Sequence, residues 1–160
     1  MNYAKIQKMD IANGLGIRTV IYFCGCNFHC HNCQNKELWN FHSGKIFSDD
    51  AKRELFEALS NEHIKGLSIL GGEPLQQGEG LLSLLKEVRN KFPDKDIWLW
   101  TGYYLSELND EQKEIINLCD YIVDGRYEEN KRDLTLNFRG SSNQTIWEKK
   151  NGKFVKSSLN

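Results

Sequence analysis

The stretch from Cys24 to Cys33 holds four of the five cysteines of this chain. Three of them, Cys26, Cys30 and Cys33, are spaced as C-x3-C-x2-C. The apolar run Thr19-Val20-Ile21-Tyr22-Phe23 stands just before them and predicts a buried strand. A strand that leads directly into three clustered thiols predicts a metal-binding loop.

The spacing of the cysteines also restricts the metal. A structural zinc site usually combines two ligand pairs that lie about a dozen or more residues apart, and this chain has no second pair. A [4Fe–4S] cluster accepts several thiolates from one loop and takes its remaining ligand from elsewhere. The only distant cysteine is Cys119, in a helical pattern beside Asp120. If Cys119 is not a ligand, one iron stays open, which is typical of a reactive metal site.

Several motifs together carry a family resemblance. The cysteine triad after a first strand, with Gly71-Gly72-Glu73-Pro74 after a second, resembles the radical S-adenosylmethionine (SAM) superfamily. Three further motifs extend the resemblance, over residues 14–144, to its family of activating enzymes of anaerobic (class III) ribonucleotide reductases. They are Asn13-Gly14-Leu15-Gly16-Ile17-Arg18, Trp100-Thr101-Gly102-Tyr103 and Arg139-Gly140-Ser141-Ser142-Asn143-Gln144. One departure is Asn32, where many of these enzymes carry an aromatic residue.

The resemblance implies a reaction. Cys26, Cys30 and Cys33 would hold a [4Fe–4S] cluster, whose open iron would bind the amino and carboxylate groups of SAM. One electron would cleave SAM to methionine and a 5′-deoxyadenosyl radical, which would abstract hydrogen from a glycine Cα and leave a glycyl radical. The implied partners are an anaerobic ribonucleoside-triphosphate reductase and a flavodoxin-like or other low-potential electron donor. No side chain of the chain is expected to be catalytic, because the cluster and SAM carry the chemistry.

The resemblance also points to the residues that would bind SAM. Gly71 and Gly72 lack a Cβ and let the backbone approach a ligand closely, and the turn with Glu73 would receive the SAM ammonium group. A plain strand-to-helix turn is the alternative. Thr101 and Asp124 resemble positions that line the SAM carboxylate, in some relatives with a bound monovalent cation, although Asp124 is read equally well as a turn aspartate.

Two residues beside the third cysteine complete the expected SAM site. Asn32 and Gln34 flank Cys33, so their backbone groups are suited to contact the adenine edge. Cys24 is expected to be a spare thiol and Cys119 a small buried residue.

The hydrophobic pattern alternates between strands and helices. Expected strands cover residues 67–70, 96–100 and 121–123 after the first one, and expected helices cover residues 48–59, 80–88 and 105–118. This succession favours parallel strands wound in βα units. The cysteine loop, the glycine turn, Thr101-Gly102 and Asp124-Gly125 each follow a strand. Ligands of α/β folds bind at the carboxyl ends of the strands, so we expect one site there.

These observations predict an α/β fold of the radical SAM type. We expect a partial, open (βα) barrel of about five or six mostly parallel strands. Residues 4–9 would add an edge strand, and a C-terminal hairpin would turn at Asn151-Gly152. Residues 1–160 would form a single radical SAM domain, because a closed eight-stranded barrel typically needs about 250 residues.

The composition excludes several classes of partner. The formal net charge is −1 with acids and bases interspersed, so we expect neither nucleic-acid nor membrane binding. The N-terminal residues form no apolar leader, and no run is long enough to span a bilayer. A cytoplasmic location is therefore expected, and in that reducing compartment clustered cysteines are typical of metal sites rather than disulfides.

Three questions stay open at this point. The target could be another glycyl radical enzyme, such as pyruvate formate-lyase, or a small molecule, as in deazaguanine synthesis. A zinc-binding interaction module without catalysis is a reading from a different class. The run of residues 139–144 could be a surface loop, or it could serve in SAM positioning or in docking the reductase.

Overall fold

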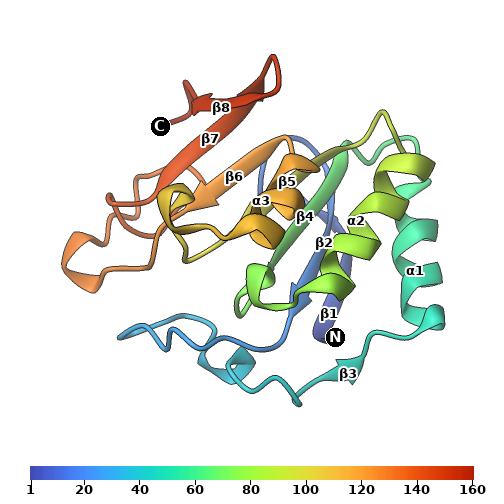
Figure 1. The fold of residues 1–160 in the computed structure, drawn as a ribbon, viewed down its shortest axis with the longest axis horizontal. Coiled ribbons are helices and arrows are strands. Elements are labelled where there is room, and N and C mark those ends of the chain that lie inside the picture. Colours follow the sequence, from blue (N-terminus) through green and yellow to red (C-terminus); the bar gives the residue numbers. More distant parts are fainter.

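The computed structural model describes residues 1–160, and all of its strands join one mixed sheet in the order β3-β1-β2-β4-β5-β6-β7-β8 (Figure 1). The strands are β1 (Asn2–Asp10), β2 (Arg18–Phe23), β3 (Lys45–Ile46), β4 (Gly66–Gly71), β5 (Asp96–Trp100), β6 (Tyr121–Asp124), β7 (Thr145–Lys150) and β8 (Lys153–Lys156). The α-helices are α1 (Asp49–Leu59), α2 (Glu79–Lys91) and α3 (Asp110–Asn117). Four 3-10 helices lie between them: η1 (Lys36–Leu38), η2 (Pro74–Gln76), η3 (Leu105–Glu107) and η4 (Glu129–Lys131).

The middle of the sheet is parallel. Strands β2, β4, β5 and β6 pair in parallel, and the helices α1, α2 and α3 make the crossovers between them. The pairing of β2 with β4 runs from Arg18 opposite Gly66 to Phe23 opposite Gly71. The cysteine loop and the glycine turn therefore leave the sheet side by side. Antiparallel strands flank this parallel centre, and the outermost strands β3 and β8 do not pair with each other.

The three helices cover one face of the sheet (Figure 1). Side chains of β5 alternate as a strand requires: Ile97 and Leu99 pack with helix residues in the main core, whereas Trp98 points to the other face. There Trp98 stacks on Tyr121, with ring centroids 4.3 Å apart, and contacts Phe138 from the segment after β6. Both faces of the central strands are thus covered, which explains their continuous apolar runs.

Local signals explain where the helices begin. Ser48 caps α1 by accepting a hydrogen bond from the backbone N–H of Ala51, at 3.3 Å. Leu55 and Leu59 of α1 are fully buried. The chain after α2 turns at Phe92 ahead of Pro93, which cannot continue a helix.

A buried arginine holds the amino ends of the parallel strands together. Arg18 of β2 is fully buried and forms an ion pair with Asp96 of β5, at 2.5 Å. Its Nε donates to Ser68 Oγ of β4, at 2.7 Å, and its guanidinium lies over the ring of Trp98. These contacts join three neighbouring strands at the end opposite to the cysteine loop.

The unclosed α/β arrangement agrees with the expected fold class, and so does the strand count: six strands, β1 to β6, precede the two strands of the C-terminal hairpin. The central four of these strands pair in parallel. The expected edge strand at residues 4–9 is longer, and it lies inside the sheet because the short strand β3 pairs on its outer side. Strand β3 has two exposed residues, too few to give a periodic pattern.

The expected helix over residues 105–118 was also wrong in its extent. The 3-10 helix η3 ends at Glu107, Leu108 is extended, and α3 begins only at Asp110. Asn109 caps α3, since its side chain accepts from the N–H of Gln112 while the Gln112 side chain accepts from the N–H of Asn109. This capping box is visible in the sequence as Asn-x-x-Gln and marks the true start of the helix.

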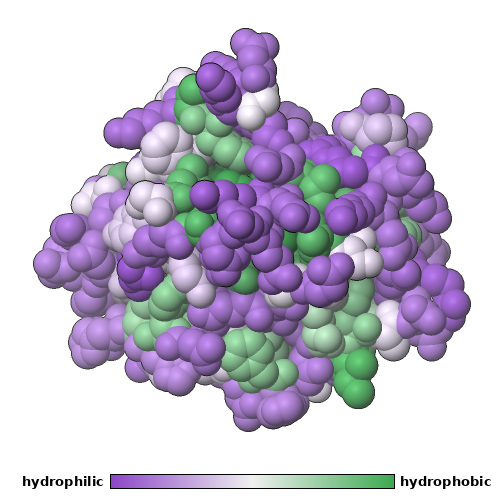
Figure 2. Space-filling model, viewed as in Figure 1, coloured by the Kyte–Doolittle hydropathy of each residue, from purple (hydrophilic) through white to green (hydrophobic).

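The expected C-terminal hairpin is confirmed: β7 and β8 pair antiparallel around Asn151 and Gly152. The surface seen in Figure 2 is mostly hydrophilic, with hydrophobic residues visible in separate areas. None of the helices is both long and apolar enough to cross a membrane.

Candidate metal centre

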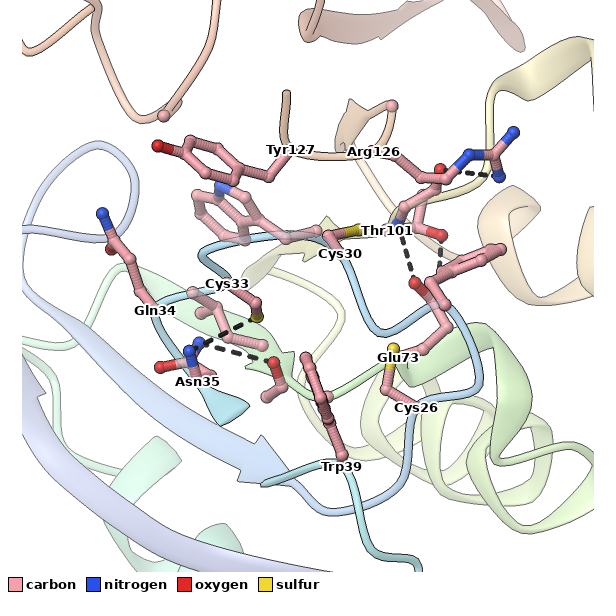
Figure 3. Close-up of a pocket in the computed structure, with 18 of the residues that line it drawn as sticks. Cys26, Cys30, Cys33, Gln34, Asn35, Trp39, Glu73, Thr101, Arg126 and Tyr127 are labelled. Carbon is pink, nitrogen blue, oxygen red and sulfur yellow. Dashed lines mark hydrogen bonds between the residues drawn. The ribbon is translucent and has the colours of Figure 1, made fainter. Parts of the chain in front are cut away.

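A hollow lies at the carboxyl ends of the parallel strands (Figure 3). Its volume is about 220 Å³. Each parallel strand contributes the residues that follow it: the cysteine loop after β2, residues 71–73 after β4, residues 100–102 at the end of β5, and residues 125–127 after β6. The expected convergence of the motifs at one edge of the sheet is therefore present.

The three cysteines of the C-x3-C-x2-C motif all line this hollow. Backbone hydrogen bonds fix the start of their loop, from Gly25 N to Leu38 O at 2.6 Å and from Cys26 N to Trp39 O at 3.0 Å. The two other cysteines lie elsewhere. Cys24 is buried beside Gly44, and Cys119 is fully buried in the main core, where burial raises the pKa of its thiol to about 12.

Electrostatics around the thiols differ along the loop. Burial raises the pKa of Cys26, and two backbone N–H groups of its own loop oppose this rise. Burial and then the neighbouring Cys33 raise the pKa of Cys30, whereas the backbone N–H of Tyr127 and the charge of Arg126 lower it. The segment after β6 therefore favours the thiolate form of Cys30.

The donor set of the hollow fits a sulfur-bridged cluster, because three cysteines of one loop line it. Their side chains do not converge on one point. A cubane offers a separate iron to each thiolate, so its ligands need to face a common space rather than a common point. All three thiols of the motif line this common space, as cluster ligands would.

The structure gives the glycine turn a reason other than ligand approach. Gly71 has φ +129°, and a Cβ on it would collide with the backbone of Phe23 in β2. A Cβ on Gly72 would collide with the carbonyl oxygens of Gly25 and Leu38. Both glycines line the hollow, yet their lack of a side chain is already required by the strand and loop packed against them.

Glu73 is buried, and the chain itself satisfies its carboxylate. Thr101 Oγ1 donates to Oε1 at 2.7 Å, the N–H of Gly102 donates to Oε2 at 2.7 Å, and the N–H of Leu75 donates to Oε1 at 3.0 Å. Burial raises the pKa of Glu73 to about 7, although these hydrogen bonds act in the opposite direction. The carboxylate thus ties the end of β4 to the end of β5 (Figure 3).

The other expected SAM-binding residues divide into two groups. Gln34 and Thr101 line the hollow together with the glycine turn. Asn32 and Asp124 do not line it. Asn32 is exposed with φ +56°, and the Asp124 carboxylate accepts the N–H of Leu105 at 3.0 Å. Burial raises the pKa of Asp124.

Several residues on the wall of the hollow were missed from the sequence. Trp39 stacks on His29 with ring centroids 4.2 Å apart, and Asn35 donates from its N–H to Cys33 Sγ at 3.4 Å. Arg126 directly follows Asp124-Gly125, so its position after a strand was a usable signal. Phe28 and Tyr127, which stand in loops without a periodic pattern, were also missed. Gly140 and Gln144 on the wall belong to the run of residues 139–144, for which the sequence left a surface loop, SAM positioning and docking open.

Comparison with known proteins gives one family model and several similar proteins. The family model described as a 4Fe-4S single cluster domain matches residues 12–147. A protein of Enterobacteria phage T4 is 40% identical over 154 residues, covering 95% of this chain and 97% of the relative. Proteins of Pasteurella multocida and Escherichia coli (strain K12) are each 39% identical, covering 92% and 91% of this chain and 97% of each relative. All three are named anaerobic ribonucleoside-triphosphate reductase-activating protein.

Proposed function

Because this chain belongs to the family of anaerobic ribonucleoside-triphosphate reductase-activating proteins and to the 4Fe-4S single cluster domains, we propose that it generates a glycyl radical on such a reductase. It would be a radical SAM oxidoreductase that modifies another enzyme and does not itself reduce nucleotides. The observation that carries the proposal is the placement of all three motif cysteines on one hollow at the carboxyl ends of parallel strands.

The proposed ligands of a [4Fe–4S] cluster are Cys26, Cys30 and Cys33, which leaves one iron for SAM. When bound, the cluster supplies one electron that cleaves SAM to methionine and a 5′-deoxyadenosyl radical, and this radical takes a hydrogen atom from the glycine. The electron comes from a low-potential donor such as a flavodoxin-like protein. Cys119 is not proposed as a ligand, because it is enclosed in the core.

The residues of the chain would bind and orient SAM. The carbonyl oxygen of Gly72 faces no hydrogen-bond donor of the chain and is the proposed acceptor for the SAM ammonium group. Glu73 would act mainly by holding the turn, since three donors of the chain already occupy its carboxylate. Gln34 and Thr101, on the wall of the hollow, are proposed to contact the adenine edge and the carboxylate side of SAM.

Asn32 and Asp124 have a weaker place in the proposal. Neither lines the hollow, and the Asp124 carboxylate already accepts the N–H of Leu105. A monovalent cation at Asp124 stays a prediction. Residues 1–160 would act as one radical SAM domain, because a single sheet contains all eight strands. The proposed location is the cytoplasm, whose reducing conditions keep thiols free for metal binding.

An anaerobic assay of the iron-reconstituted protein tests the proposal. Dithionite and SAM are added with and without the reductase, and 5′-deoxyadenosine and the glycyl radical are followed, the latter by electron paramagnetic resonance. A glycyl signal on the reductase is the expected result. SAM cleavage without that signal would reassign the substrate, and a colourless protein with one bound zinc and no SAM affinity would overturn the proposal.

A further inference from the structure

The middle of the cysteine loop has few hydrogen bonds of its own. No backbone N–H from residue 28 to residue 32 donates to another backbone group. The N–H of Asn27 donates to Gln76 Oε1 at 2.8 Å, and the N–H of Cys33 donates to the carbonyl oxygen of Cys30 at 3.1 Å. The backbone of Cys30 is therefore bonded only within its own loop, and its position relative to the strands depends on what packs against the loop.

Phe28 provides that contact by packing on the rim of β5. Its ring meets Tyr103 edge to face, with centroids 4.7 Å apart, and the guanidinium of Arg126 lies over it at 4.8 Å. A Cβ on Gly102 would lie 2.8 Å from the same ring. We refer to the site formed by Gly102, Tyr103 and Arg126 as the Phe28 seat. The seat binds one aromatic side chain between Cys26 and Cys30.

Arg126 is in turn fixed from two sides. Its guanidinium donates to Glu107 Oε1 at 2.6 Å and to the carbonyl oxygen of Gly102 at 3.4 Å. Asn143 Nδ2 donates to the carbonyl oxygen of Arg126 at 2.7 Å and to Tyr104 Oη at 2.9 Å.

A second side chain of the same run holds the residue before Arg126. Gln144 Nε2 donates to the carbonyl oxygen of Gly125 at 3.0 Å. Gln144 Oε1 accepts from the N–H groups of Gly140 and Ser141, at 2.9 and 3.1 Å, so the run also folds upon itself. We refer to the Asn143 and Gln144 side chains as the clasp, because together they bind the backbone of both residues 125 and 126.

We propose that the clasp positions residues 125–127. This segment supports the cysteine loop in addition to the hydrogen bond at Asn27, so the clasp holds Cys30 in place through the Phe28 seat. Asn143 and Gln144 are positioning residues here, and the run of residues 139–144 has an assigned task. Arg126, whose guanidinium lies over the Phe28 ring, belongs to the supported segment. The inference rests on the proposed iron–sulfur ligation but not on the identity of the substrate.

The test measures how fast the reconstituted cluster loses iron to a ferrous chelator under anaerobic conditions. Asn143→Leu and Gln144→Met keep the side-chain size and remove the clasp donors. We expect iron release to become about tenfold faster or more in each, the usual effect of losing an outer-shell partner of a metal site. Ser142→Ala is the matched control, since Ser142 belongs to the same run, is exposed, and its hydroxyl binds no other residue.

A second pair of variants tests the seat without touching the clasp. Phe28→Leu is expected to speed iron release to a similar extent, whereas Phe28→Tyr keeps a ring for Arg126 and Tyr103 and should restore nearly the parent rate. The electron paramagnetic resonance spectrum of the reduced cluster should broaden in Phe28→Leu and not in Phe28→Tyr. This rescue separates positioning of the loop from general destabilisation.

Parent-like release rates in both clasp variants would overturn the proposal, even if Phe28→Leu were faster. Weaker SAM binding at an unchanged release rate would overturn it too, because the run would then contact the cosubstrate directly. The assay needs neither SAM nor the reductase. If the variants release iron at the expected rates but the protein forms no glycyl radical, the result would therefore support the clasp and refute only the proposed function.

Discussion

At the scale of single residues, the site is shaped as much by packing as by ligand chemistry. Gly71 and Gly72 were expected to give a ligand access to the backbone, and the structure shows that the neighbouring backbone already excludes a Cβ there. Glu73 was expected to face an ammonium group, and the chain supplies its carboxylate with three donors. Substitutions at these positions therefore test the packing of the site before they test its contacts with a ligand.

Gly71→Ala is expected to destabilise the protein by more than Gly152→Ala. Both glycines have positive φ, which costs a residue with a Cβ about 1–3 kcal/mol, but only at Gly71 does the added Cβ also meet backbone. A Cβ added at Gly152 would have no other atom within 4 Å. Chemical denaturation of the two variants measures the difference, and equal losses would show that the collision with Phe23 is relieved without cost.

The pKa of Glu73 predicts a dependence of stability on pH. Because its pKa is about 7 in the folded protein and 4.5 ordinarily, the folded state binds more protons between these values. The contribution of Glu73 to the free energy of unfolding is thus fully present below about pH 4.5 and is lost as the pH rises through about 7, in total on the order of 3 kcal/mol.

Urea denaturation of the cluster-free protein between pH 4.5 and 8 measures this effect. The parent should lose stability relative to Glu73→Gln as the pH rises, because the variant cannot titrate at that position. Glu57→Gln, at an exposed position on α1, serves as the control and should run parallel to the parent. A constant difference between parent and Glu73→Gln would contradict the raised pKa.

At the scale of the elements, periodic hydrophobic patterns in the sequence predicted the strands and helices that have them. Very short elements and pairings between distant parts of the chain were missed. Apolar runs in the sequence identify strands β2, β4, β5 and β6, and each of these strands is followed by a motif that lines the hollow. Strand β3 is too short for any periodicity, and the inward place of β1 follows from pairing with β3 far along the chain. The break before α3 was readable in its capping box, yet the apolar spacing of Leu108 with Ile115 hid it.

The functional site likewise contains residues that the sequence identified and residues that it missed. The three cysteines were identifiable because their spacing is itself the chemical signal. The Phe28 seat was not, because Gly102, Tyr103 and Arg126 meet Phe28 only after three strands have brought their ends together.

Replacing the cysteines of the loop after β2 and replacing the cysteine after α3 are expected to have different effects on cluster binding. Replacing Cys26, Cys30 or Cys33 by Ala should abolish cluster binding and with it SAM cleavage. Cys119→Ala should keep the full iron content, at a cost of about 1 kcal/mol in the free energy of unfolding for a smaller core side chain. Iron and sulfide analysis after reconstitution measures this, and iron loss in Cys119→Ala would overturn the ligand assignment.

At the scale of the whole molecule, the parallel strands carry different tasks at their two ends. Their carboxyl ends hold the loops of the hollow, and their amino ends hold Arg18 with Asp96 and Ser68. The two ends are separated by the length of the strands and share no side chain. Substitutions at the amino ends should therefore change stability without changing cluster binding.

Arg18→Met is expected to cost on the order of 3 kcal/mol of unfolding free energy, because it leaves Asp96 without its buried partner. The iron content per folded molecule should stay at the parent level. Arg53→Met, which removes an exposed ion pair with Asp50, is the control and should change stability little. Denaturation and iron analysis are made on the same samples, and a matching loss of iron in Arg18→Met would show that the two ends are coupled.

The sheet has two free margins, since β3 and β8 remain unpaired on their outer sides. A closed barrel would surround a reactive species with its own wall, whereas a sheet that stops short leaves one flank to be supplied from outside. A glycine carried on another protein would then arrive together with the surface that shuts water out. Under the proposed function, the substrate would then also be the lid, and the activator would need no gate of its own.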